Sequence, residues 1–276
     1  MKMAEISLTT GMRANLFQLQ QTTKGMETAQ SRLSTGLRVQ SALDDPVAFF
    51  KAAEHTQRAG DLAGRKDEMT EAVGTVNAAN NGIEAITNLI EAAKSLAQSA
   101  QSESNTTDRA TLQTQFNSML TQINNLANDS TYKGVNLLNG TGDTLVVTFD
   151  ADGTNKLTLT GFDAEVGTGG LSITSAENWS DNTVGNVSTV ISNLDTAKNT
   201  LRTESQKLSN NMSIITARQD FTDKMINTLE DGAGALTNAD MNEEGANMLM
   251  LQTRQSLGTT SLSLASQAAQ SVLRLF

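Results

Sequence analysis

Residues 62–97 read LAGRKDEMTEAVGTVNAANNGIEAITNLIEAAKSLA, and within them an apolar side chain returns at every seventh position. The repeating positions are Leu62, Met69, Val76, Ile83, Ile90 and Ala97. Alanine or isoleucine stands three residues after most of them, which completes the apolar pair of a heptad repeat. Such a repeat is typical of a helix that packs along a second helix. The stretch therefore predicts a long helix in a coiled-coil rod.

A second stretch, nearer the other end of the chain, offers the partner helix. Its heptad positions are Val187, Leu194, Leu201, Leu208, Ile215, Thr222 and Leu229, all apolar except one. A helix of about 43 residues is about 65 Å long at a rise of about 1.5 Å per residue, which suits a rod better than a compact enzyme. We expect the two runs to complete each other through a set of rod-packing residues: Leu62, Val76, Ile83, Ile90, Leu194, Leu201, Leu208 and Ile215.

Both ends of the chain carry further apolar lines. The first segment holds Leu8, Met12, Leu19, Met26 and Leu33. The last segment holds two lines, one with Leu257, Leu264 and Ala268, the other with Leu262, Ala265, Ala269, Val272 and Phe276. A helix that is apolar on two sides needs partners on both. The N-terminal helix can supply one partner, so we expect another copy of the chain to supply the second.

The residues between these runs predict where the helices begin and end. Gly36 interrupts the first segment, and Asp45 followed by Pro46 has the chemistry of a helix start. An apolar stripe within residues 112–126 suits an antiparallel return helix after the polar connector SESNTTDR. The glycine-containing stretch EDGAGALTNAD, residues 230–240, predicts a break before the last helix.

Residues 140–187 differ in character from the rest of the chain. They contain eight of the 20 glycines and short alternating runs such as TLVVTF and KLTLTGF, separated by the turn sequence DADGTN. Seven acidic residues and one lysine give this region a net charge of −6, more than half of the −10 of the whole chain. We expect a β-hairpin region on a solvated outer face.

Composition excludes many functions. The chain has no cysteine and one histidine, so disulfide frameworks, cysteine nucleophiles and multi-histidine metal centres are impossible within one chain. The DADGTN turn lacks the glycine and the distal glutamate of a calcium loop. A net charge of −10 disfavours nucleic acid, and no apolar run approaches the roughly 18 residues that span a bilayer. We expect no catalysis, cofactor, metal, nucleic-acid partner or membrane insertion.

Two longer stretches carry a resemblance to a known family. Residues 32–45, RLSTGLRVQSALDD, and residues 235–276, ALTNADMNEEGANMLMLQTRQSLGTTSLSLASQAAQSVLRLF, resemble the two end signatures of bacterial flagellins. The likeness covers roughly the first 140 and the last 90 residues in the family's order. The resemblance implies a mainly α fold, a long antiparallel coiled-coil rod with a small β-hairpin region and paired termini. The long central insertion of larger flagellins is absent, so the chain resembles a minimal member.

The resemblance also implies a different structural role for each segment of the chain. Residues 1–43 would form an N-terminal inner-tube helix, 44–139 the first half of the rod, 140–187 its hairpin region, 188–236 its long C-terminal helix, and 237–276 a C-terminal inner-tube helix. The inner-tube residues would be Leu8, Met12, Leu19, Met26, Leu33, Leu257, Leu262, Leu264, Val272 and Leu275.

The family also implies the partners of the chain. It would polymerise with itself into a helical filament that drives swimming. It would meet an export chaperone, the filament cap and the hook-filament junction proteins. Export would use the flagellar type III apparatus without a cleavable signal, which places the protein in the extracellular filament.

Two alternative functions remain open on the residues alone. A hook-filament junction protein shares the terminal architecture. A secreted coiled-coil adhesin could bind polysaccharide through the hairpin region, where Trp179 is the only large aromatic residue able to stack on a sugar.

The resemblance implies that one family property is reduced in this chain by substitution. In flagellins that an innate immune receptor detects, the recognised patch includes an Arg-x-Arg-Glu-Leu-like stretch and a glutamate on the next helix. The matching stretch EAAKSLA puts Ala92 at the first arginine and Lys94 at the second, and it retains Leu96. Gln115 stands at the other glutamate. The resemblance therefore implies a poor agonist of that receptor.

Overall fold

The computed structural model describes residues 10–140, 142–181 and 184–273. The helices of this part of the chain are α1 (Thr10–Thr35), α2 (Pro46–Ser102), α3 (Thr106–Asp129), α4 (Val184–Thr237) and α5 (Met241–Leu273). The strands are β1 (Thr131–Tyr132), β2 (Val135–Asn136), β3 (Thr144–Thr148) and β4 (Lys156–Thr160), and η1 (Trp179–Asp181) is a single 3-10 turn. The expected mainly α fold with a small hairpin region is confirmed.

The chain forms two compact units. The first comprises Met1–Gln57 with Leu229–Phe276 and contains the terminal helices α1 and α5. The second comprises Arg58–Thr228 and contains the rod, with α3 and the hairpins.

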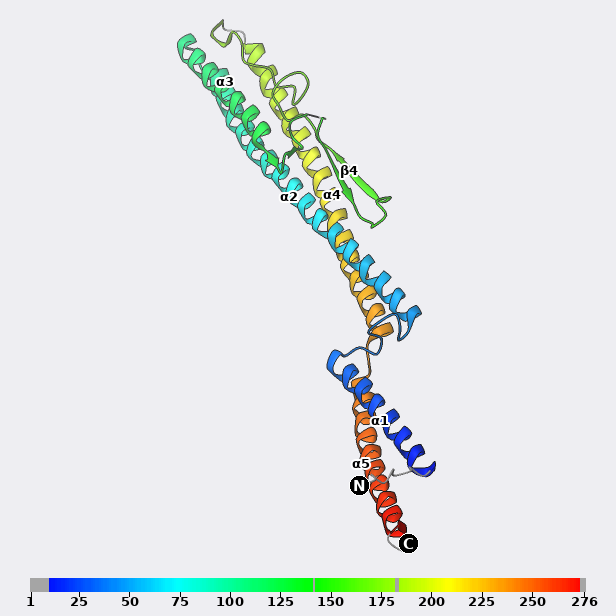
Figure 1. Ribbon diagram of the computed structural model, residues 1–276. Coiled ribbons are helices and arrows are strands. Elements are labelled where there is room, and N and C mark those ends of the chain that lie inside the picture. The colour runs from blue at the N-terminus through cyan, green and yellow to red at the C-terminus, as the bar shows by residue number, and fades with distance from the viewer. Residues whose placement is uncertain (1–9, 141, 182–183, 274–276) are drawn as a thin grey trace, which may run out of the picture. The chain divides into compact units, whose positions relative to one another are not determined.

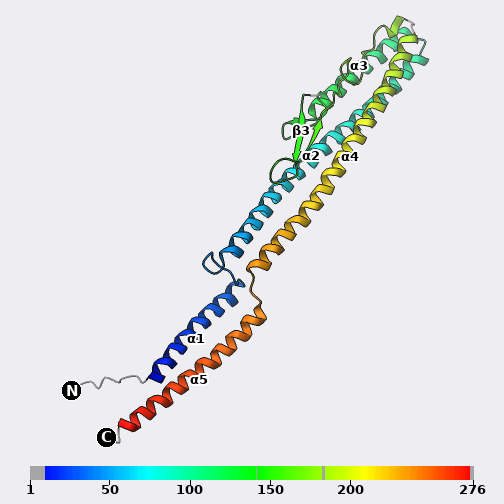
Figure 2. The ribbon, with the colours of Figure 1, turned by 90° about the vertical axis from the view of Figure 1, so that its right-hand side faces the viewer.

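In the second unit α2 and α4 run antiparallel side by side (Figures 1 and 2). Lys66 Nζ lies 2.6 Å from Asp223 Oδ1, and Lys94 Nζ lies 2.5 Å from Asp195 Oδ1. Lys94 follows Lys66 by 28 residues, and Asp195 precedes Asp223 by the same number. The two helices therefore keep one register over four heptads, and the predicted antiparallel coiled-coil rod is confirmed.

The apolar seam of the rod is buried. Its largest members on α2 are Met69, Ile86 and Ile90, and α3 adds Phe116 and Ile123. The eight predicted rod-packing residues are all buried: Leu62, Val76, Ile83, Ile90, Leu194, Leu201, Leu208 and Ile215. Alanines fill many of the remaining inward positions, which lets the helices approach closely.

Most predicted helix boundaries agree with the structure, and one is wrong. α1 ends at Thr35 before Gly36, whose φ of 73° is left-handed. Asp45 Oδ1 accepts hydrogen bonds from the backbone N–H groups of Val47 and Ala48, so it caps α2 as expected. The sequence predicted a break over residues 230–240, but α4 continues to Thr237 and α5 begins at Met241, so the break is shorter. A helix tolerates its two glycines there at a cost of about 1 kcal/mol each.

A small hairpin at β1 and β2 was not expected from the sequence. Its turn is Lys133–Gly134, and both residues have positive φ, as a two-residue hairpin turn requires. Tyr132 donates its hydroxyl to Glu71 Oε2 over 3.0 Å, and Lys133 Nζ lies 2.8 Å from the same oxygen. Gly74 leaves room for the tyrosine ring on α2. The Lys-Gly pair between apolar and aromatic residues is the signal that predicts this turn.

The longer hairpin β3–β4 lies within the predicted 140–187 region (Figure 1). Leu145 pairs with Leu159, and Val147 pairs with Leu157. These four side chains share one face and belong to the apolar core or pack against it. The guanidinium of Arg218 on α4 lies 5.3 Å from the ring centroid of Phe149, just beyond β3.

The loop after β4 is held on the rod by amide side chains of α3. Asn117 accepts a hydrogen bond from the backbone N–H of Ala176 and donates one to its carbonyl. Gln113 also donates to the Ala176 carbonyl and accepts from the backbone N–H of Trp179. Asn124 accepts from the backbone N–H of Val166. These amide side chains satisfy backbone N–H and carbonyl groups of the loop, as a neighbouring strand does in a sheet.

We predict that Gly82→Ala destabilises the rod by about 2 to 4 kcal/mol. A Cβ on Gly82 would lie 2.6 Å from Leu138 Cδ1 and would also overlap Ser130 Oγ. Gly64→Ala is the matched control, because the same helix leaves open space there, and we expect it to stabilise by about 0.5 to 1 kcal/mol. Urea unfolding of both variants checks the difference in sign, and equal effects would contradict it.

Candidate assembly surfaces

The terminal helices α1 and α5 pack along each other (Figures 1 and 2). Each helix has a glycine opposite a leucine of the other. Leu19 Cδ1 lies 2.9 Å from the point that a Cβ on Gly258 would occupy, and Leu251 Cδ1 lies 3.5 Å from the equivalent point on Gly25. The expected pairing of the two ends of the chain is confirmed.

One ion pair joins the two helices. Arg32 Nη1 lies 2.7 Å from Glu244 Oε1, and the glutamate side chain is mostly buried. A buried carboxylate that loses its partner is costly, so this pair fixes how the start of α5 meets the end of α1. Asp240 begins α5 by accepting hydrogen bonds from the backbone N–H groups of Asn242 and Glu243.

The other side of α5 carries apolar side chains that no part of the described chain covers. Leu257 is 63% exposed and Leu264 is 62% exposed, one heptad apart. Leu262 on the second predicted line is half-buried. Exposed large apolar residues in a line mark a surface for association.

The predicted inner-tube residues occupy different environments. Met12 is buried, and Leu19, Met26, Leu33 and Leu262 are half-buried. Val272 belongs to α5 by its backbone, and Leu8 and Leu275 lie outside the described residues. Sequence reasoning missed the exposed Leu16, Phe17 and Leu249, which lie off the heptad lines. Their large apolar side chains at polar heptad positions are the signal that would have found them.

The two connectors between the terminal pair and the long helices are bonded to each other. Arg38 donates its backbone N–H to the Thr237 carbonyl over 2.7 Å, and Ala239 donates to the Gly36 carbonyl over 2.9 Å. Arg38 Nη2 also donates to the Leu236 carbonyl. A short set of antiparallel backbone hydrogen bonds therefore joins the two connectors.

A turn in the first connector depends on one carboxylate. Asp44 Oδ2 accepts hydrogen bonds from the backbone N–H groups of Gln40 and Ser41 and from the Ser41 hydroxyl. These donors hold the pKa of Asp44 below its ordinary value of 3.8, and the backbone N–H of Ser41 makes the largest contribution. The carboxylate therefore stays ionised while it closes the turn.

The residues of the predicted receptor patch lie on α2 and α3. Gln115 is exposed, and Ala92 and Leu96 are half-buried. The ammonium group of Lys94 is already engaged with Asp195 of α4.

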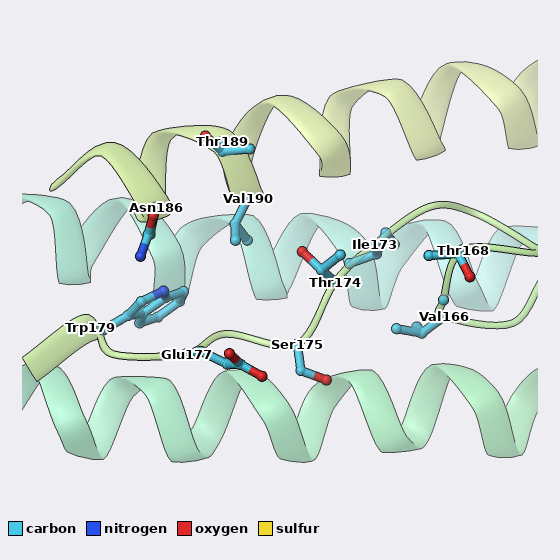
Figure 3. A pocket seen from close by; sticks show the side chains of 11 residues that line it. Val166, Thr168, Ile173, Thr174, Ser175, Glu177, Trp179, Asn186, Thr189 and Val190 are labelled. Carbon is cyan, nitrogen blue, oxygen red and sulfur yellow. The ribbon is translucent and has the colours of Figure 1, made fainter. Parts of the chain in front are cut away.

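A pocket of about 630 Å³ lies between the loop after β4 and the start of α4. Figure 3 shows Trp179 at one end of it and Val166 and Thr168 at the other. Trp179 is fully buried, and its ring centroid lies 5.0 Å from that of Phe116. The expectation that Trp179 can stack on a sugar is therefore wrong, because neither face of the ring is open.

Other chemistry is sparse in the part of the chain that the structure describes. It contains no group of three or more histidine, cysteine or acidic residues able to hold a metal ion. None of its helices combines the length and the apolar character that crossing a membrane requires. In the DADGTN turn, Asp150 accepts hydrogen bonds from Thr154 and Asn155, so its carboxylate closes the turn.

The fold and the uncovered apolar line define a helical-rod protein with paired termini. The family description "Bacterial flagellin N-terminal helical region" matches residues 6–143, and "Bacterial flagellin C-terminal helical region" matches residues 184–276. Flagellin FljM of Caulobacter vibrioides is 30% identical over 100% of both chains, and a flagellin of Brucella melitensis is 30% identical over 99% of both. A crystal structure of Bacillus cereus flagellin aligns with 59% of this chain and 88% of that one, at 20% identity and a TM-score of 0.41.

The chain belongs to the bacterial flagellins. It is a structural subunit that polymerises with itself into the flagellar filament, the propeller for swimming. Only the small hairpin region separates its two matched helical halves, so it is a short form without outer domains.

We predict that acid opens the connector turn at Asp44. Because its folded pKa lies below 3.8, the turn gains stability that is complete above this value and is lost as the pH falls through the lower folded pKa. Hydrogen exchange at the Gln40 and Ser41 amides should therefore show reduced protection only below about pH 4, after correction for intrinsic rates. Asp44→Asn should lower the protection at pH 6 already, and a variant with wild-type protection would refute the assignment.

Proposed function

We propose that the outer face of α5, with α1, makes the subunit-to-subunit contacts of an inner tube in the filament. The uncovered line of Leu257 and Leu264 carries this proposal, because a helix apolar on two sides gains from a second partner. In this scheme residues 1–43 and 237–276 build the inner tube. Residues 44–139, the 140–187 hairpin region and residues 188–236 build the surrounding rods.

The remaining partners follow from the family and are part of the same proposal. The subunit travels through the flagellar type III apparatus without a cleavable signal and is held by an export chaperone beforehand. It then meets the hook-filament junction proteins and the filament cap. It performs no catalysis, needs no cofactor and acts outside the cell.

A junction protein would add only one layer to a filament end, whereas a filament subunit elongates without limit. Growth of pure protein on sheared filament seeds therefore separates the two. The adhesin alternative lost its main support with the burial of Trp179.

We predict that Leu257→Asp with Leu264→Asp abolishes elongation of seeds while the rod stays folded. Each charge would be buried against the neighbouring subunit without a partner, at a cost of several kcal/mol. Circular dichroism should retain most of the helix, because these residues do not belong to the rod seam. Ser263→Asp is the matched control, since it adds a charge next to Leu264 but off the line, and it should still elongate. Normal growth of the double variant would contradict the inner-tube role.

We also propose that this flagellin is a poor agonist of the innate immune receptor. Ala92 cannot form the bidentate contacts of an arginine, and Lys94 is paired with Asp195 instead of being free for a receptor. Loss of one desolvated, charge-assisted anchor costs about 2 to 5 kcal/mol.

A reporter-cell titration tests this second proposal. We expect weak potency for the wild type and a gain for Ala92→Arg combined with Gln115→Glu. Lys133→Arg, a change of similar chemistry on the β1–β2 turn, serves as the control. Wild-type potency equal to that of a strongly stimulatory flagellin would overturn the proposal.

A further inference from the structure

Two further sets of exposed apolar side chains lie away from α5. The first is at the start of α2 and consists of Leu43, Val47 and Phe50, which we name the connector patch. Leu43 is 95% exposed, an unusual environment for a leucine. In helical spacing, Val47 and Phe50 share their face with Glu54. Together with Asp44 and Asp45 beside Leu43, Glu54 gives the patch three carboxylates against one cation, Lys51, which is exposed one turn after Val47.

The second set lies on α4 and consists of Ile214, Arg218 and Phe221, which we name the α4 stripe. These positions are four and three residues apart and therefore lie on one face of the helix. The other positions on that face, 217, 224 and 225, hold alanine, lysine and methionine, and Asp220 is an exposed acid at its edge. The nearby Asp223 points the other way, toward Lys66 on α2.

An open helical polymer joins copies through two different surfaces, one on each side of every contact. The connector patch and the α4 stripe meet that requirement, because both are apolar at the centre and they differ in charge. Carboxylates outnumber cations around the first, and Arg218 with Lys224 outnumbers Asp220 on the second. Opposite charges around two apolar centres select each other and disfavour pairing of either surface with itself.

We infer that the connector patch of one copy docks on the α4 stripe of a neighbouring copy in the filament. The inference rests on polymerisation of the chain and adds a contact separate from the inner tube. Leu43 and Phe50 are buried against Ile214 and Phe221 in this contact, and Arg218 lies among the carboxylates of the connector patch.

The absence of cysteine from the chain allows a direct cross-linking test. Leu43→Cys with Phe221→Cys places one thiol on each surface, so a short bis-maleimide should join copies in series within filaments. We expect a ladder of covalent multimers well beyond the dimer on denaturing gels. Leu43→Cys with Val146→Cys is the matched control, because Val146 is 51% exposed and Phe221 is 53% exposed in the same unit.

Elongation of seeds before cross-linking separates the two questions. Filaments that grow normally but give no ladder, or the same ladder with the Val146 control, would overturn the docking and leave the filament function intact. A ladder specific to the Phe221 pair supports it.

A charge variant provides the second measurement, which needs no cysteine. Arg218→Glu should raise the critical concentration for elongation by about tenfold, with Arg202→Glu, the same change at an exposed position earlier on α4, having little effect. Phe149→Leu removes the contact between Arg218 and the Phe149 ring without changing charge, so it reports any effect that passes through the hairpin. A critical concentration unchanged in Arg218→Glu, or changed equally in Phe149→Leu, would refute the docking.

Discussion

The constant register between α2 and α4 is the constraint on which the rest of the rod depends. The pairs from Lys66 with Asp223 to Lys94 with Asp195 hold it over four heptads. Each pair is partly exposed and contributes little energy alone. Their value lies in specificity, because a slip by one heptad keeps every apolar residue in the seam but removes these partners. On the side of α2 that faces the β1–β2 hairpin, Gly74 and Gly82 leave space for Tyr132, Ser130 and Leu138.

The β elements depend on that helical surface more than on each other. Neither two-stranded sheet has enough strands to be stable alone in water. The first is held by Glu71, and the loop after the second is held by Gln113 and Asn117. Polar side chains on helices thus replace the missing strands, which explains how a chain with only 38% hydrophobic residues keeps its backbone satisfied.

The long helices could be predicted from the sequence because a heptad repeat arises when two helices make the same contact every seven residues. The sequence also predicted the cap at Asp45, whose chemistry is local. It failed where a tertiary contact outweighed a local signal. Gly232 and Gly234 suggested a break, but α4 continues through them with Ala233 buried. Trp179 suggested a sugar platform, but its full burial and its contact with Phe116 show that it belongs to the core. For the assembly surface, the heptad pattern predicted the two apolar lines of α5. It did not predict Phe17 or the connector patch, because these residues do not recur at heptad spacing.

The alanines of the α2 seam have a consequence for the whole filament. Ala79, Ala93 and Ala97 are almost completely buried, so the distance between helix axes is set by methyl groups with no slack. In the proposed arrangement of rods around an inner tube, every subunit repeats that distance. Because all subunits are identical, any change in that distance would occur in every one of them. Alanine has no side-chain rotamers, so it keeps the distance between the helix axes narrowly defined.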